Sequence, residues 1–128
     1  FQPTQGFSRH PKPWLPASSP VSLDQQLSDP SSMFALTKEM IQIRKKHPAL
    51  ATGAFDMMKQ EGEVIAFHRK DKDQTLLIAC NFGNSSQQLK ADLNQYKSIP
   101  IRAFQRNGIM TKDSLEIPPY GFSILIKK

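Results

Sequence analysis

One stretch of the chain, residues 29–50, combines a helix that has clear ends with a wide apolar stripe. Asp29 suits the N-cap and Pro30 suits the first helical position, so we expect the helix to begin there. Pro48 disfavours helical geometry at the residue before it, so we expect the helix to end near Lys46. The apolar side chains that recur at helical spacing are Met33, Phe34, Leu36, Met40, Ile41 and Ile43. A stripe this wide requires another surface to cover it.

After Gly53 the pattern changes from helical spacing to short strands separated by turn residues. The strands that we expect are 54–59, 63–69, 75–82, 86–90, 100–105, 114–117 and 121–127. Short strands with this punctuation are typical of an antiparallel sandwich or barrel. The run Leu76–Cys80 is apolar throughout, which predicts a central strand. Asn107-Gly108 is a strong signal for a two-residue hairpin.

These patterns predict a mostly β fold, namely an antiparallel β-sandwich preceded by one amphipathic helix and an irregular N-terminal segment. The irregular segment is residues 1–29, where five prolines interrupt any regular period. The helix occupies 30–50 and the sandwich 51–128. A chain of 128 residues is one domain's worth. The sandwich can bury a modest core by itself, whereas the helix and the N-terminal segment need more surface than they supply.

Composition excludes several classes of partner. The net charge of +6 permits nucleic-acid binding, but the cations are dispersed. Their densest group, Arg44–Lys46, lies at the expected end of the helix, where cations complement the helix dipole. We therefore expect no nucleic-acid partner. No apolar run approaches the ~20 residues of a membrane helix, so we expect no membrane partner either.

The ends of the chain and its single cysteine also bear on its context. The first residue is Phe1 and no signal peptide opens the chain, so we interpret it as a piece of a longer polypeptide. Cys80 is the only cysteine, which excludes an intrachain disulfide and favours a cytoplasmic location.

The sequence contains no recognisable catalytic, metal or cofactor motif. The three histidines are not spaced as metal ligands, and no glycine-rich phosphate loop is present, so we expect no metal and no cofactor. Glycosidases use two carboxylates, but nothing singles out two of the eleven acidic residues as a pair. We therefore expect no catalytic residue within this chain.

Trp14 is the candidate substrate-binding residue. Sugars stack on flat aromatic rings, and this sole tryptophan stands between Pro13 and Leu15-Pro16 in what we expect to be an ordered loop. The alternative is that its ring packs against a neighbouring protein surface.

Two stretches near the N-terminus carry a family resemblance. The chain contains Gly6-Phe7-Ser8 and then Lys12–Pro16, which together resemble the loop that closes the catalytic barrel in oligo-1,6-glucosidases, dextran glucosidases and trehalose-6-phosphate hydrolases. It then contains Asp29–Ser32 and Met40–Leu50, which resemble the last barrel helix of the same enzymes. These are α-glucosidases of the α-amylase superfamily, glycoside hydrolase family thirteen.

Two further stretches extend the resemblance to the end of the chain. Leu77–Phe82 resembles a strand of the C-terminal β-domain of these enzymes, and Ile117–Phe122 resembles its closing strand. The chain departs from the family pattern at Gln5, where alanine is usual, and at Ser22–Gln26, where the family has an Asn-Val-x-x-Gln stretch. Together the four stretches cover nearly the whole chain.

The resemblance implies a domain without catalytic residues of its own. In the family, the nucleophile, the acid/base and the transition-state stabiliser lie on earlier barrel strands, whose motifs are absent here. A barrel needs about 250 residues, so this chain cannot contain one. The resemblance therefore implies the last barrel helix plus the C-terminal β-domain of a retaining α-glucosidase. Such an enzyme acts on α-glucosidic bonds of small oligosaccharides in carbohydrate metabolism.

The resemblance also names a partner for the apolar stripe, which is the catalytic (β/α) barrel of the parent enzyme. In the isolated chain, the stripe at 30–46 is expected to be exposed, repacked or self-associated. The alternative function is a carbohydrate-binding β-sandwich module that holds an oligosaccharide through Trp14.

Overall fold

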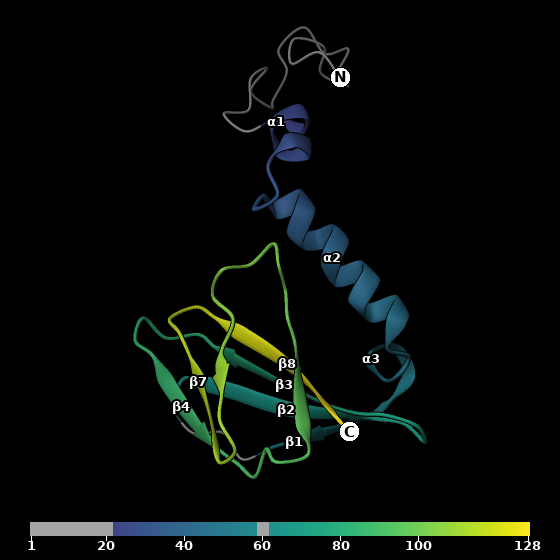
Figure 1. The fold of residues 1–128 in the computed structure, drawn as a ribbon, viewed down its shortest axis with the longest axis vertical. Helices are drawn as coiled ribbons and strands as arrows, with labels where there is room; N and C mark the ends of the chain where they lie inside the picture. The colour runs from purple at the N-terminus through teal and green to yellow at the C-terminus, as the bar shows by residue number, and fades with distance from the viewer. Residues whose placement is uncertain (1–21, 59–61) are drawn as a thin grey trace, which may run out of the picture.

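The computed structural model describes residues 22–58 and 62–128 and arranges them as helices followed by strands. The helices are α1 (Leu23–Ser28), α2 (Met33–Lys46) and α3 (Ala49–Thr52). The strands are β1 (Ala54–Met57), β2 (Val64–Lys70), β3 (Thr75–Asn81), β4 (Gln87–Lys90), β5 (Tyr96–Ile99), β6 (Ile109–Met110), β7 (Ser114–Ile117) and β8 (Phe122–Lys127). Figure 1 shows α1 and the first part of α2 projecting beyond the sheets, while α3 leads into β1.

The strands form two antiparallel sheets. The larger sheet has the order β1-β2-β3-β8-β5 and the smaller has the order β4-β7-β6. All six pairings between these strands are antiparallel. β3 lies at the centre of the larger sheet, as its apolar run predicts. The prediction of a mostly β, antiparallel sandwich is confirmed.

The core of the sandwich lies between the two sheets. Successive strand residues point to opposite faces, so every second residue of β2 and β3 enters this core. The buried side chains that fill it are Val64, Ala66, Leu77, Ala79, Leu89, Leu93, Leu115, Ile117 and Leu125. Each large aliphatic side chain removed from water contributes about 1.5–3 kcal/mol, so this core accounts for the cohesion of the two sheets.

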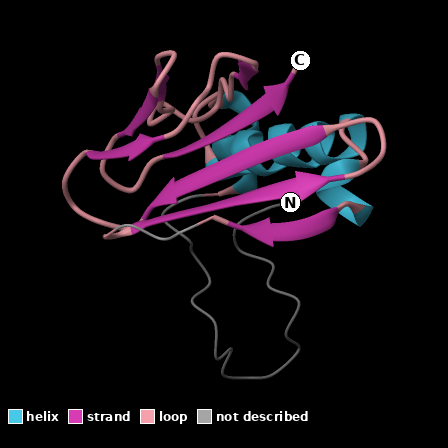
Figure 2. Cartoon of the chain, turned by 90° about the horizontal axis from the view of Figure 1, so that it is seen from below, coloured by secondary structure: helices cyan, strands magenta, loops and turns pink. Residues whose placement is uncertain are grey.

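A third layer covers the opposite face of the larger sheet. Leu76, Ile78 and Ile124 point to that face and are buried in a second cluster with Ile43 of α2 and Ala49 of α3. Figure 2 shows the helices lying against this sheet. The larger sheet is therefore apolar on both faces, with the smaller sheet on one side and the helices on the other.

The predicted start of the helix at Asp29 and Pro30 is wrong. α2 begins at Met33, and its N-cap is Ser32, whose Oγ accepts a hydrogen bond from the N–H of Ala35 at 3.2 Å. The Asp29 carboxylate instead accepts from the N–H of Ser31 at 2.8 Å, which forms a turn between two helices. The end at Lys46 agrees with the prediction, and the short helix α3 follows after Pro48.

The expectation that residues 1–29 are irregular is wrong for α1. Ser22 and Gln25 form a capping box, in which Ser22 Oγ accepts from the N–H of Gln25 at 3.2 Å and Gln25 Oε1 accepts from the N–H of Ser22 at 3.0 Å. The sequence does contain this Ser-x-x-Gln capping pattern, and it begins only two residues after the last of the five prolines. Residues 1–21 lie outside the described part of the chain.

The strand predicted at 100–105 is also wrong. Ile101 and Ala103 are buried at alternate positions, as in a strand. Their backbone nevertheless runs in a loop whose N–H groups bond to side chains instead of to a neighbouring strand. The N–H of Ile101 donates to Asn107 Oδ1 at 3.3 Å, and the N–H of Ala103 donates to Glu39 Oε2 at 2.8 Å.

The hairpin predicted at Asn107-Gly108 is wrong because Asn107 has another role. Its Nδ2 donates to the carbonyl of Ile101 at 2.8 Å and also to that of Phe104, so the side chain closes the preceding loop. In this part of the chain, the turn between two paired strands lies a few residues later, at 111–113, where it joins β6 to β7.

Gly53, which joins α3 to β1, provides a test of how tightly the helical layer is attached. A Cβ at this position would lie 2.5 Å from the carbonyl oxygen of Ala49 and 2.9 Å from that of Lys70. Both atoms belong to the backbone and cannot move aside cheaply. We predict that Gly53→Ala lowers the free energy of unfolding by about 1–3 kcal/mol, measured by urea denaturation. Ala54→Ser, which adds one atom at the exposed neighbouring position, is the control, and equal stability of both variants would contradict the prediction.

Candidate functional site

The substrate-binding residue predicted from the sequence, Trp14, lies outside the described residues, and its role stays a prediction. Within 22–58 and 62–128, no group of three or more His, Cys, Asp or Glu side chains is placed to hold a metal ion. None of the helices described there has the length and apolar character needed to cross a membrane. The remaining candidates for a functional surface in the described part are its exposed apolar residues and its polar clusters.

Large apolar side chains are exposed on α1 and α2, and we call them the exposed helix residues. Their exposed fractions are 49% for Leu23, 58% for Leu27, 69% for Met33, 38% for Phe34 and 47% for Ile41. Leu23 and Leu27 are one turn apart on α1, and Phe34 and Ile41 are two turns apart on α2, so each pair shares a helix side. Exposed apolar clusters of this kind mark contact surfaces.

Hydrogen bonds hold α1 and α2 together as one unit. Gln26 of α1 accepts at Oε1 from the N–H of Phe34 at 3.1 Å. The carbonyl oxygen of Gln26 accepts from the hydroxyl of Ser32 at 2.7 Å. The exposed helix residues of α1 and α2 therefore keep a fixed relation to one another.

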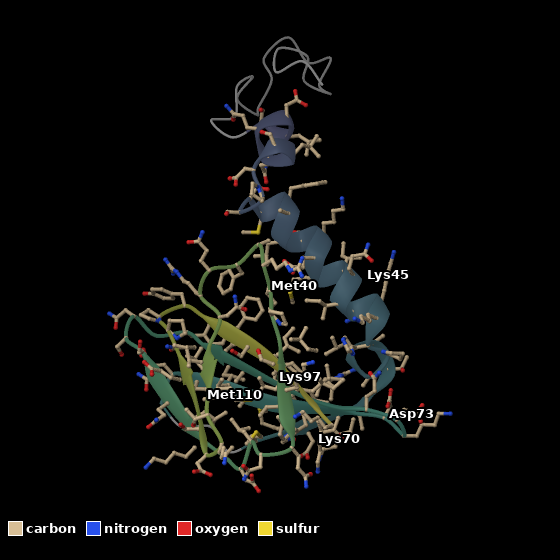
Figure 3. The ribbon with its side chains drawn as sticks, in the orientation of Figure 1. Met40, Lys45, Lys70, Asp73, Lys97 and Met110 are labelled. Carbon is tan, nitrogen blue, oxygen red and sulfur yellow. The ribbon has the colours of Figure 1, made fainter. Side chains whose placement is uncertain are left out.

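The apolar stripe of α2 is divided between two sides of the helix. Leu36 and Met40 pack against the cluster that contains buried Ile43, and this side covers the larger sheet. Figure 3 shows Met40 directed toward the sheets and Lys45 directed away from them. The interpretation that the whole stripe awaits an outside partner is therefore wrong for these three residues. Met33, Phe34 and Ile41 are left exposed by the strands, and for them the interpretation stays a prediction.

Exposed apolar residues continue onto the helix-bearing face of the larger sheet. Phe55 and Met57 on the edge strand β1 are 53% and 54% exposed. Met57 lies opposite Phe67 in the sheet register, and the rings of Phe55 and Phe67 are 5.0 Å apart. Phe67 packs against the cluster beneath α2, which places this edge on the same side of the sheet as the helices.

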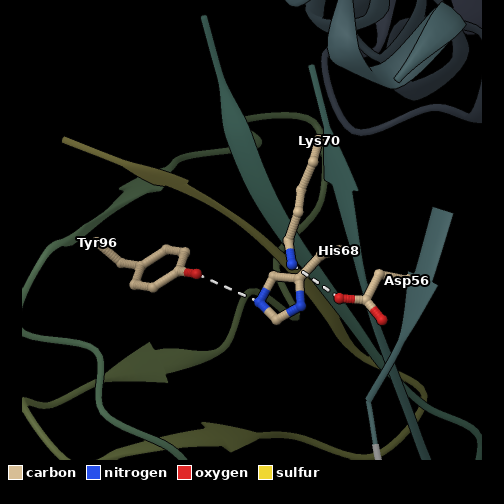
Figure 4. Close-up of polar contacts among 4 residues, drawn as sticks. All are labelled: Asp56, His68, Lys70 and Tyr96. Atoms are coloured by element: carbon tan, nitrogen blue, oxygen red, sulfur yellow. Dashed lines mark hydrogen bonds and ion pairs between the residues drawn. The ribbon is translucent and has the colours of Figure 1, made fainter. Parts of the chain in front are cut away.

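A polar cluster joins β1 and β2 to β5 (Figure 4). Lys70 Nζ and Asp56 Oδ2 form an ion pair of 2.7 Å, and the Tyr96 hydroxyl lies 3.2 Å from His68 Nε2. Burial and the charge of Lys70 lower the pKa of His68, and burial raises the pKa of Tyr96. The hydrogen bond and charge of Lys70 lower the pKa of Asp56. Both Asp56 and Lys70 are largely exposed, so their pairing adds little to stability.

This cluster does not have the chemistry of a glycosidase site. It contains one carboxylate, which Lys70 holds in its ionised form, so Asp56 is a poor proton donor near neutral pH. Glycoside hydrolysis needs a second carboxylate about 5–9.5 Å away, and the cluster supplies none. The hydrogen bond between Tyr96 and His68 instead links β5 to β2 across the larger sheet, beside the core between the two sheets.

Two shallow hollows on the described surface also lack acidic residues. The first, of about 290 Å³, is lined by Leu93, Asn94, Tyr96, Met110, Thr111 and Lys112. The second, of about 310 Å³, is lined by Cys80, Asn81, Phe82, Tyr120, Gly121 and Phe122. Because neither lining includes a carboxylate, neither hollow can provide the acid and base of glycoside hydrolysis.

Sequence reasoning assigned the wrong surroundings to two residues of α2 and its end. Glu39 falls opposite the apolar stripe in the helical pattern, which predicts the solvent side, but its carboxylate accepts backbone hydrogen bonds from the loop at 101–103. His47 follows the last turn of the predicted helix, where the helix dipole favours a partly charged imidazole. The structure instead buries His47, and burial together with the charge of Lys46 lowers its pKa. Both environments depend on segments distant in sequence, so the local pattern carried no signal for them.

Comparison with known proteins gives the fold a family. A model of the family described as Maltogenic Amylase, C-terminal domain, matches residues 55–124. This range runs from β1 into β8. The chain is 38% identical over 74 residues to an oligo-1,6-glucosidase of Halalkalibacterium halodurans, covering 55% of this chain and 13% of the relative. It is 29% identical over 113 residues to a glucan 1,6-alpha-glucosidase of Streptococcus pneumoniae, covering 86% of this chain and 21% of the relative.

Solved structures agree on the fold. An alpha-glucosyl transfer enzyme superposes with a TM-score of 0.76 at 20% identity, covering 88% of this chain and 20% of that enzyme. A trehalose-6-phosphate hydrolase of Bacillus licheniformis superposes with a TM-score of 0.73 at 21% identity, covering 91% of this chain and 22% of the hydrolase. This chain thus spans about a fifth or less of the relatives that it matches.

The fold and the family match together define the class of protein: a β-sandwich domain of α-amylase-type enzymes. Within that class, the chain belongs to the Maltogenic Amylase, C-terminal domain family. The resemblance to the C-terminal part of an α-amylase-superfamily glucosidase is confirmed. The alternative of a carbohydrate-binding module is not favoured by these relatives.

The two buried or half-buried histidines generate a prediction about pH. His68 and His47 both have a folded-state pKa below 6.5, so the unfolded chain binds protons more readily. The stability is therefore fully present above pH 6.5 and is lost as the pH falls through 6.5 toward the folded-state pKa. We predict a lower urea midpoint at pH 5.5 than at pH 7.5. His68→Gln and His47→Gln should each reduce that difference, and the exposed control Lys45→Gln should not. An unchanged pH difference in both histidine variants would contradict the assignment.

Proposed function

We propose that this chain is the C-terminal structural domain of a retaining α-glucosidase that cleaves α-glucosidic bonds of small oligosaccharides. The observation that carries the proposal is the combination of the family match with the exposed helix residues. The matched domain begins at residue 55, so α1, α2 and α3 precede it in the chain. These helices therefore lie on the side from which a preceding catalytic domain would connect.

The substrate class rests on the relatives. Two of the relatives are named oligo-1,6-glucosidase and glucan 1,6-alpha-glucosidase, and both names describe enzymes that act on glucosidic bonds. Neither the Asp56 cluster nor the two hollows supplies a pair of carboxylates. The catalytic groups of the proposed enzyme therefore belong to its barrel domain, and this domain contributes support instead of chemistry.

The proposed partner of the exposed helix residues is that catalytic (β/α) barrel. Apolar side chains that are 38–69% exposed on a helical unit gain free energy when another surface covers them. Covering the exposed parts of five such residues contributes on the order of 5 kcal/mol. Phe55 and Met57, on the same side of the larger sheet, extend the surface available to the partner. In the absence of the barrel, the same surface is proposed to drive self-association of the chain.

The cytoplasmic location also belongs to the proposal. It is supported by the single cysteine, Cys80, which is a free thiol in the structure. Burial raises the pKa of this thiol, which makes it a poor nucleophile.

We predict that the purified 128-residue chain does not hydrolyse p-nitrophenyl α-glucoside, because it holds none of the catalytic carboxylates of the family. The measurement is release of p-nitrophenol at pH 6–7, with an intact oligo-1,6-glucosidase as the positive control. Turnover that copurifies with the chain through two columns would overturn the assignment of all catalytic groups to another domain.

We predict that replacing the exposed helix residues weakens docking in the full polypeptide that carries this chain. Phe34→Asp combined with Ile41→Asp places two charges on the proposed contact, so thermal inactivation of the enzyme should become at least several-fold faster. Gln42→Asp, an exposed change on the same helix, is the control. In the isolated chain, the double variant should also reduce self-association measured by sedimentation velocity. Inactivation rates equal to that of the control would contradict the docking surface.

A further inference from the structure

α2 meets the rest of the domain through two kinds of contact. Leu36, Met40 and Ile43 supply apolar contact with the cluster on the larger sheet. The hydrophobic effect itself is non-directional, and the angle of a packed helix is set by how its side chains interdigitate with the surface beneath. Hydrogen bonds between the helix and that surface add a directional constraint on the angle.

Glu39 supplies such bonds on the side of α2 that faces the domain. Its Oε1 accepts from the N–H of Arg102 at 2.9 Å, and its Oε2 accepts from the N–H of Ala103 at 2.8 Å. Among the described residues, these are the only hydrogen bonds between α2 and the segment 53–128. One carboxylate thus receives two successive backbone donors, and bonds to an ionised acceptor are stronger than neutral ones.

The loop that offers these donors is itself held rigidly. Ile101 is 1% exposed, and Asn107 bonds to both the N–H and the carbonyl of Ile101. The ring of Phe104 lies 4.6 Å from the ring of Phe122 on β8. Glu39 therefore bonds to a fixed part of the sandwich instead of to a loop that could follow the helix.

The C-terminal end of the helical layer has a separate attachment. Arg69 of β2 donates from Nε to the carbonyl of Ala49 at 3.2 Å and from Nη2 to that of Ala51 at 3.4 Å. This attachment holds α3, beyond the end of α2. Glu39 lies about 10 Å further along the helix axis, at 1.5 Å per residue. Two attachments at that separation fix a direction, whereas one alone leaves a pivot.

We propose that Glu39 is the positioning residue that fixes the angle of α2 across the larger sheet, and so sets the direction in which the exposed helix residues face. This deepens the proposed docking function and rests on it for its consequence. The positioning itself is a property of this chain alone. Removing the carboxylate leaves α2 attached at α3 and through Leu36, Met40 and Ile43. Phe34, about 8 Å beyond Glu39 along the axis, and the residues of α1 that precede it are then displaced most, because they lie furthest from α3.

The first test follows the two backbone amides by nuclear magnetic resonance on the isotope-labelled 128-residue chain. We expect the amide protons of Arg102 and Ala103 to exchange at least tenfold faster in Glu39→Ala, and not in the matched control Gln42→Ala. We also expect the chemical shifts of both amide protons to change in Glu39→Gln, because one of the two carboxylate acceptors is lost. Unchanged exchange rates and unchanged shifts of Arg102 and Ala103 in both Glu39 variants would overturn the proposal.

The second test measures the angle. Nitroxide labels at Lys38→Cys on α2 and Lys90→Cys on β4, in a Cys80→Ala background, report the distance between helix and sandwich. We expect Glu39→Ala to broaden the distance distribution and Glu39→Gln, which keeps one acceptor oxygen, to restore part of its sharpness. If Glu39→Ala detaches the whole helix, the Glu39→Gln distribution decides the question. Unchanged distributions in both variants would overturn the positioning role.

These measurements separate the two proposals because neither uses the catalytic domain. If Glu39→Ala loosens α2 but the full polypeptide is inactivated by heat no faster, Glu39 does not affect docking through the exposed helix residues. If Glu39 holds the angle of α2 but Phe34→Asp with Ile41→Asp leaves the enzyme unchanged, the docking surface is refuted and the positioning role of Glu39 stands.

Discussion

The architecture depends on one strand that is buried on both faces. In β3, the four consecutive residues from Leu76 to Ala79 are each no more than 9% exposed. Because neighbouring strand residues point in opposite directions, such a run must have a packed layer on each side. Leu77 and Ala79 face the smaller sheet, while Leu76 and Ile78 face α2 and α3. The helical layer is therefore part of the domain's own core and not only a connection to whatever precedes it.

The double burial explains why α2 has two apolar sides. One side must cover Leu76 and Ile78, and that task takes Leu36, Met40 and Ile43. Those three residues cover the sheet, and Met33, Phe34 and Ile41 are left partly exposed. An isolated domain would gain solubility by making these positions polar. The proposed contact with a preceding barrel domain would account for their apolar character.

The sequence predicted the features that depend on local period and missed those that depend on distant partners. The central position of β3, the sandwich and the end of α2 at Lys46 follow from apolar runs, strand alternation and Pro48. The strand expected at 100–105 failed although Ile101 and Ala103 alternate correctly. Alternation reports which side chains are buried, but it does not report where the backbone hydrogen bonds go. There they go to Asn107 and Glu39, the latter more than sixty residues away.

The same limit applied to the start of α2. Asp29 and Ser32 are both good caps, and sequence alone does not decide between them. The structure uses both: Asp29 closes the turn after α1, and Ser32 begins α2. The existence of α1 decides the choice, because Gln26 of α1 bonds to Phe34 and to the Ser32 hydroxyl. The helix boundary is thus a tertiary property.

Side-chain amides and carboxylates hold the irregular parts of this domain. Asn81 ends β3. The two N–H bonds of its Nδ2 are shared among the carbonyls of Ser85, Ile117 and Pro118 at 2.8–3.1 Å, and its Oδ1 accepts from the N–H of Gly83 at 2.9 Å. One buried side chain therefore joins the stretch 77–82 to the stretch 117–122, the two β motifs on which the resemblance rests. Both motifs are needed to satisfy the same amide, since a buried amide left without partners is costly. Asn81 connects β3 to the segment before β8, and Glu39 connects α2 to the loop at 101–103. In both places, one side chain bonds to several backbone groups that are not paired with a neighbouring strand.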